Sequence, residues 1–181
     1  LLEIKTKSWT MRMPFVILLL AIEGQTASVS RFTNVECEIL DIGYITYPKC
    51  NLKLVGRGIV GLNINMKLLK PPVETVKLNL SLWRKFNGFR PFMFNTTFDY
   101  CKYAERPTLS FQHIVFSAIR DSSNINHTCP YDHDIIVHNM IFKEEYLRLM
   151  PLPAGEYQFQ ILIATYNKWR TMIKATVLHN E

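Results

Sequence analysis

Hydrophobic and polar residues alternate with a period of two along most of the chain after Cys50. This period is typical of strands that have one face in a core and one in water, because successive side chains point to opposite faces. The segments that alternate most clearly are 62–68, 76–82, 92–98 and 157–163, while 169–178 alternates less cleanly and 134–142 is nearly apolar throughout. The pattern therefore predicts an all-β domain of about seven or eight antiparallel strands.

One segment has a helical period instead. From Pro107, apolar residues recur at intervals of three and four, at Phe111, Ile114, Val115, Ala118 and Ile119. Proline suits the first turn of a helix and the polar run 121–124 would end it, so we expect one short helix over 107–120. No linker, repeat or low-complexity segment divides the chain, and the sequence predicts a single β-sandwich domain over 31–181.

The segment Phe86-Asn87-Gly88-Phe89 is a strong hairpin signal. A two-residue Asn-Gly loop would turn the leucine row 78–82 and the phenylalanine row 92–98 to opposite faces of the sheet. A three-residue loop over 86–88, with Gly88 in the left-handed region, keeps both rows on one face and pairs Lys85 with Phe89. We predict this loop, from which a uniform register gives the pairs Leu82–Phe92, Leu80–Phe94 and Val76–Phe98.

A short apolar run near the N-terminus has the pattern of a secretory signal peptide. Residues 14–22 are continuously apolar, Arg12 precedes them, and small residues follow between Gly24 and Ser30. The run is much shorter than the roughly 20 residues that a membrane-spanning helix needs. A buried core strand or helix is the alternative interpretation. We interpret 11–30 as a signal peptide and 1–10 as sequence upstream of the initiator, which predicts a secreted, extracellular product that does not span a membrane.

All four cysteines follow this segment, at Cys37, Cys50, Cys101 and Cys129. An even number of cysteines in a secreted chain indicates two disulfides, for which three connectivities exist. The cysteines are too widely spaced, and the histidines too dispersed, for a zinc cluster, so we expect no bound metal. Of the three connectivities we favour Cys37–Cys50 with Cys101–Cys129.

Three N-x-S/T sequons, at Asn79, Asn95 and Asn126, are candidate glycosylation sites and agree with secretion. Asn79 and Asn95 fall on the polar side of their predicted strands, where a glycan can project into water. In the predicted register these two residues lie opposite one another, so their glycans would crowd one another.

The charged and potentially catalytic residues form no recognisable nucleic-acid-binding or catalytic motif. The net charge is +6, but no run of Lys or Arg exceeds the pair Arg84-Lys85, so we expect no nucleic-acid partner. The chain has no nucleophile-elbow, zinc-protease, P-loop or dinucleotide-binding motif. The densest polar cluster is Tyr131-Asp132-His133-Asp134, which permits a metal site or an acid–base pair. Because no further ligand types converge on it, we interpret it as a solvated turn, and we expect a non-enzymatic protein without a cofactor.

The apolar rows raise the question of what the core contains. From composition alone, an ordinary filled sandwich core is the simpler interpretation. A sandwich whose sheets splay apart would instead enclose an apolar cavity, which is the usual form of a small-ligand site. The candidate lining residues are Leu78, Leu80, Leu82, Phe92, Phe94 and Phe98 on one wall, with Phe116, Phe159 and Ile161 on the opposing wall.

Several short motifs resemble a large insect family of secreted proteins of unknown function, to whose neighbourhood the CheB chemosensory proteins belong. The most specific are the N-G-F-R-P-F hairpin at 87–92 and the N-H-T-C-P-Y block at 126–131, and Tyr47-Pro48-Lys49-Cys50, Asp99-Tyr100-Cys101 and P-x-P-x-G-x-Y at 151–157 also match. By resemblance, this family is placed near the lipid-recognition (ML) superfamily, whose members are immunoglobulin-like β-sandwiches that hold a lipid between two sheets.

The resemblance implies an immunoglobulin-like β-sandwich that binds a lipid or another apolar small molecule, in chemosensation or extracellular lipid transport. The alternative is a secreted accessory module for a membrane receptor or channel that holds no ligand of its own. The chain departs from the best-known lipid carriers because it has four cysteines rather than six or more, and because it adds the helix 107–120.

Overall fold

The computed structural model describes residues 30–108, 110–147, 150 and 152–180. The segment 1–10 and the signal peptide predicted over 11–30 lie outside the described residues, except for Ser30. The elements are β1 (Arg31–Ile39), β2 (Ile45–Gly56), β3 (Ile59–Leu68), β4 (Val76–Phe86), β5 (Gly88–Asp99), α1 (Tyr100–Glu105), α2 (Phe111–Arg120), β6 (Ile135–Ile141), the 3-10 helix η1 (Glu144–Leu147), β7 (Gly155–Thr165) and β8 (Lys168–His179).

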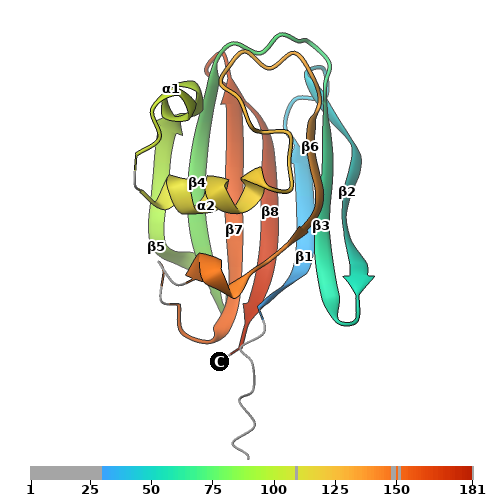
Figure 1. The fold of residues 1–181 in the computed structure, drawn as a ribbon. Coiled ribbons are helices and arrows are strands. Elements are labelled where there is room, and N and C mark those ends of the chain that lie inside the picture. The colour runs from blue at the N-terminus through green and yellow to red at the C-terminus, as the bar shows by residue number, and fades with distance from the viewer. Residues whose placement is uncertain (1–29, 109, 148–149, 151, 181) are drawn as a thin grey trace, which may run out of the picture.

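The eight strands form two antiparallel sheets (Figure 1). The larger sheet has the order β1-β8-β7-β4-β5, and the smaller has the order β2-β3-β6. This arrangement confirms the predicted all-β sandwich. Along one side of it, β1 lies beside β2 and β3. The disulfide Cys37–Cys50 joins β1 to β2, and therefore joins the two sheets along that side.

Helix α2 completes the layer that contains the smaller sheet. A sheet of three strands is too narrow to cover one of five, and Figure 1 shows α2 crossing in front of β5, β4 and β7. Its aromatic residues cover the phenylalanine row of β5, since Phe111 packs on Phe94 and Phe116 on Phe98. The helix therefore covers this part of the larger sheet, which further strands would cover in a symmetric sandwich.

The helical segments differ from the prediction on the N-terminal side of the 107–120 region, while the predicted end of the helix at residue 120 is confirmed. Helix α2 begins at Phe111 rather than Pro107, because Ser110 has an extended backbone with φ −156° and ψ 173°. A second helix, α1, follows β5 directly. The Asp99 side chain accepts a hydrogen bond from the Lys102 backbone N–H (3.1 Å), which caps this helix. Helix α1 has only six residues, too few to produce a recognisable apolar period.

The β4–β5 hairpin has the predicted turn but a different register beyond it. Lys85 pairs with Phe89, and Gly88 has a positive φ of 119°, as expected for the three-residue loop. A bulge then interrupts the ladder near Met93, whose φ is 60°. Past the bulge the pairs are Leu80–Thr96 and Leu78–Phe98, so the predicted Leu80–Phe94 and Val76–Phe98 pairs are wrong and Leu82–Phe92 falls within the bulge.

The bulge preserves the faces of both strands. It adds two residues to β5 between the pairs Trp83–Pro91 and Ser81–Asn95. Because side chains alternate with a period of two, a two-residue shift leaves every later side chain on its original face. The leucine and phenylalanine rows therefore still share the inner face, as predicted.

A partly exposed ion cluster lies at the end of the sandwich where β1 meets β8. The Asp41 carboxylate contacts the Lys168 ammonium (2.8 Å) and the Arg170 guanidinium, whose carbon lies 3.9 Å from the centre of the Tyr44 ring. Hydrogen bonds from Lys168, and then from Arg170, lower the pKa of Asp41 from 3.8 to about 2. The ionised form is thus favoured in the folded state.

We expect Asp41→Asn to lower the melting temperature at neutral pH and to have little effect near pH 2. The depressed pKa contributes stability above the ordinary value near 3.8, and this contribution is lost as the pH falls toward about 2. Circular dichroism melts from pH 2 to 7 measure the difference, with Asp132→Asn at an exposed carboxylate as the control. A variant as destabilised at pH 2 as at pH 7 would contradict this origin of the effect.

Candidate ligand cavity

A cavity of about 190 Å³ lies between the two sheets and α2. One wall comes from the larger sheet, including Val76 and Leu78 on β4, Phe159, Ile161 and Ile163 on β7, and Ile173 and Ala175 on β8. The other wall comes from the smaller sheet and the helix, including Leu62, Ile64 and Met66 on β3, Val137 and Met140 on β6, and Ile114, Phe116, Ala118 and Ile119 on α2. The cavity therefore lies between the two layers of the sandwich.

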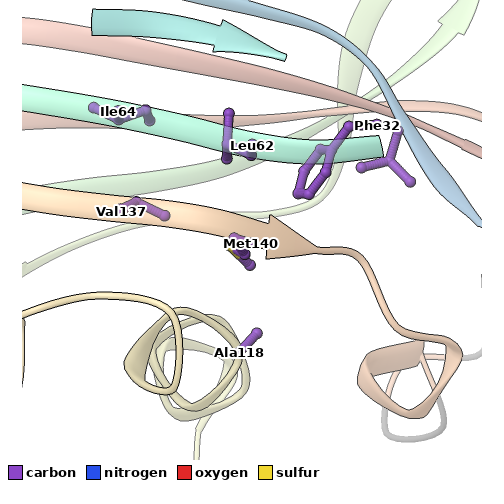
Figure 2. Packing of buried hydrophobic residues seen from close by; sticks show 7 residues of the cluster. Phe32, Leu62, Ile64, Ala118, Val137 and Met140 are labelled. Carbon is purple, nitrogen blue, oxygen red and sulfur yellow. The ribbon is translucent and has the colours of Figure 1, made fainter. Parts of the chain in front are cut away.

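The helical side of the cavity is visible in Figure 2. Leu62 and Ile64 lie along β3, Val137 and Met140 lie along β6, and the Ala118 methyl group points from α2 toward Met140. The alternation of β3 places Leu62 and Ile64 on one face, and the half-buried face of α2 completes the same surface. Three separate elements thus converge on this part of the wall.

The surface of the wall that faces the cavity is wholly apolar. In the part of the chain that the structure describes, the lining contains no charged side chain, and its hydroxyl groups have partners within the protein. Tyr131 donates to the His127 carbonyl (2.6 Å), so the 3.1 Å contact between the Tyr100 and Tyr131 hydroxyls leaves Tyr100 as the donor. Thr165 accepts from Arg170 (2.9 Å). Burial raises the pKa of both Tyr100 and Tyr131, which keeps their phenols neutral.

The structure divides the predicted lining residues into two groups. Leu78, Phe116, Phe159 and Ile161 line the cavity. The others are core residues beside it. Leu82, Phe92 and Phe94 pack with Met150, Leu152 and Tyr157, Phe98 packs against Tyr103 and Phe116, and Leu80 is almost completely buried.

The predicted division between the walls is wrong for β7. Leu80 pairs with Ile161 and Leu82 with Phe159, because β4 and β7 are neighbours in one sheet. Phe159 and Ile161 therefore belong to the same wall as Leu78, and only Phe116 lies opposite. The opposing residues of β3 lay in an alternating row and those of β6 in a nearly apolar run, but neither pattern reveals which strands face one another across a core.

The polar cluster at 131–134 has structural partners. Asp134 accepts a hydrogen bond from the Leu68 backbone N–H (3.1 Å), and the His133 Nε2 atom lies 2.8 Å from that of His127. Asn124 donates to the carbonyl of Asp134 (2.7 Å). The bond from Leu68 joins the loop before β6 to β3, and the other two contacts hold the loop together. Among the described residues, no three His, Cys, Asp or Glu side chains are grouped as a metal site would require.

Both favoured disulfides are present, which confirms the predicted pairing. Cys101–Cys129 joins α1 to the loop that precedes β6, two residues before the cavity-lining Tyr131. Within the described ranges, no helix has the length and apolar character needed to cross a membrane.

The sequons on the hairpin are in contact although their register differs from the prediction. Asn79 pairs with Thr97 rather than with Asn95, because the bulge shifts the ladder by two residues. Its Nδ2 atom nevertheless donates to the Asn95 side-chain oxygen (2.7 Å) as well as to the Thr97 hydroxyl (2.9 Å). The two side chains therefore occupy one site on the outer face, while Asn126 is exposed in the loop before β6.

Residues 78–159 match the model of a family described as a protein of unknown function, DUF1091. The matched segment runs from β4 into β7 and contains both the N-G-F-R-P-F hairpin and the N-H-T-C-P-Y block. It also contains α2 and one strand of each cavity wall, β4 and β6. No curated protein matches the chain.

Proposed function

We propose that the protein is a secreted, non-enzymatic binder of a lipid or another hydrophobic small molecule. The observation that carries this proposal is the apolar cavity between the sheets. Its volume of about 190 Å³ exceeds that of an engineered cavity of about 150 Å³ that binds benzene. An apolar space of this size can hold a small apolar molecule, which supports the proposal.

The energetic cost of an empty cavity supports the same proposal. Unfilled apolar volume destabilises a protein by about 24 cal/mol per Å³, so a cavity of 190 Å³ costs about 4–5 kcal/mol. Domains of this type have a net stability of only about 5–15 kcal/mol. A ligand that fills the space would recover much of that cost through burial and dispersion contacts.

Three features support an extracellular setting for this function. The two disulfides are stable in an oxidising compartment, the sequons lie at the surface, and the 11–30 segment has the pattern of a signal peptide. The resemblance to the CheB-related proteins and to the ML superfamily favours chemosensation or extracellular lipid transport.

We expect protein secreted from insect cells to retain a hydrophobic molecule from the medium or the host. Non-denaturing mass spectrometry would show a mass increment above that of the glycosylated polypeptide, and solvent extraction would release the molecule for gas chromatography. The denatured protein is the control, because it has no cavity. An empty native protein that also fails to bind added apolar ligands would contradict the proposal.

A second candidate is an accessory module for a membrane receptor or channel, and one surface feature favours it. Large apolar side chains are exposed at the end of the sandwich that contains Asp41, namely Leu40, Ile42, Leu69, Tyr166 and Trp169. Ile42 is 83% exposed, which is unusual for an isoleucine that has no partner. Affinity for a receptor that persists after Ala175→Phe, a substitution in the cavity wall, would favour this candidate.

A further inference from the structure

Among the described residues, the cavity wall offers no partner for an ionised group. The described wall presents only apolar atoms to the cavity. The Tyr100 hydroxyl donates to the Tyr131 hydroxyl, which donates to the His127 carbonyl, so neither phenol has a free proton to donate to a ligand. The remaining lining hydroxyls also have hydrogen-bond partners. The Thr165 hydroxyl accepts from the Arg170 side chain, and the Tyr146 hydroxyl donates to the Ala118 carbonyl (3.5 Å). A charged head group placed inside would lose its hydration without gaining a hydrogen bond, which is strongly unfavourable.

Among the described residues, two cations lie near the cavity without lining it: Arg170, which donates to Thr165 and is paired with Asp41, and Arg120. A second hollow of about 120 Å³ shares Tyr100, Phe116 and Ile125 with the cavity and is bordered by Arg120 and His127. Arg120 is exposed at the end of α2. An arginine in water adds little affinity for a carboxylate, because both groups are already well solvated.

The volume limits the size of the ligand. Benzene, with six non-hydrogen atoms, fits a cavity of about 150 Å³, so a cavity of 190 Å³ holds about eight such atoms. A complete fatty acid or sterol would have to widen the space between α2 and the sheets.

We infer that the cavity takes a neutral molecule of about eight non-hydrogen atoms and discriminates against ionised ligands, in particular carboxylates. This inference rests on the proposed function and narrows it, because lipid carriers in general also accept charged amphiphiles. Selectivity arises here because the described residues of the wall offer no polar partner, rather than from a specific recognition group.

A pair of isomers tests the charge discrimination. Methyl hexanoate and heptanoic acid contain the same atoms, but at pH 7.4 only the acid is ionised. Isothermal titration calorimetry of the delipidated full-length secreted protein should show that methyl hexanoate binds at least tenfold more tightly than heptanoate. Heptanoate that binds as tightly as the ester, or more tightly, would overturn the inference.

Arg120→Gln provides the matched variant. Its side chain is exposed, so the fold should be unaffected, and we expect the affinities for the ester and for heptanoate to remain unchanged. If the variant selectively weakened heptanoate binding, the head group would lie at Arg120, and the inference would fall while the proposed function would stand. If neither the ester nor 1-heptene bound, the proposed function itself would fail, and the inference with it.

Chain length tests the limit on size. Each buried CH₂ raises affinity about fourfold, so affinity should rise from methyl butanoate to methyl hexanoate and then level off. A continued rise of about fourfold per CH₂ up to methyl decanoate would overturn the size limit.

Discussion

Ala175→Phe is expected to leave the protein folded and to abolish ligand binding. Ala175 lies on the inner face of β8, lines the cavity and is flanked by Val35 of β1 and Phe159 of β7. A phenylalanine ring at this position would occupy the space that the ligand needs. We expect the affinity for methyl hexanoate to fall at least tenfold and the melting temperature to change little, because the ring fills existing volume.

Ala164→Phe is the matched control. Ala164 is as small as Ala175 and is 2% exposed, but it does not line the cavity. A phenylalanine there has no space to enter, and overpacking of this kind costs about 1–3 kcal/mol. The melting temperature should therefore fall by roughly 2–12 °C. Equal destabilisation by the two substitutions would indicate that the interior is filled in solution.

Removal of the Cys101–Cys129 disulfide is expected to destabilise the protein more than removal of Cys37–Cys50. Its loop spans 28 residues, for which the chain-entropy model predicts about 3.6 kcal/mol, against about 3 kcal/mol for the 13-residue loop of Cys37–Cys50. The bond also fixes the segment that carries Tyr131 against α1, so ligand binding should weaken as well.

Paired serine substitutions measure this ranking. Cys101→Ser with Cys129→Ser should lower the denaturant midpoint and the affinity for methyl hexanoate more than Cys37→Ser with Cys50→Ser does. Cys37 and Cys50 join the sheets on the side away from α2, so their loss should affect stability more than binding. The opposite order of stability would show that the disulfide between the two sheets, Cys37–Cys50, stabilises the fold more than the disulfide that closes the longer loop.

The sequence was sufficient for the elements that it marks with a regular pattern. The rows at 62–68, 76–82 and 157–163 are strands, and the turn at Gly88 has the predicted pairing, because period-two burial and turn chemistry are local properties. Strand β1 was not named in advance. Within β1, two consecutive exposed residues at 33–34 separate the buried Phe32 from the alternating segment 35–39, so an irregularity breaks the period near the start of the strand.

The arrangement of the cavity walls could not be predicted in the same way. Ile161 was expected opposite Leu80, and it is instead its neighbour in the same sheet. Strand order depends on which rows bury the most apolar surface together, which is a property of the whole fold. Leu80 and Leu82 had the same pattern as Leu78, and only the position of α2 determines which of the three borders empty space.

The bulge at Met93 has a consequence for how this protein tolerates changes of length. Because the two additional residues of β5 leave the faces unchanged, the same strand could lose both of them and still direct Phe94 and Phe98 inward. Loss of one residue would instead turn that row toward water and bring Asn95 into the core. Insertions and deletions at this point of the hairpin should therefore be accepted in pairs and rejected singly.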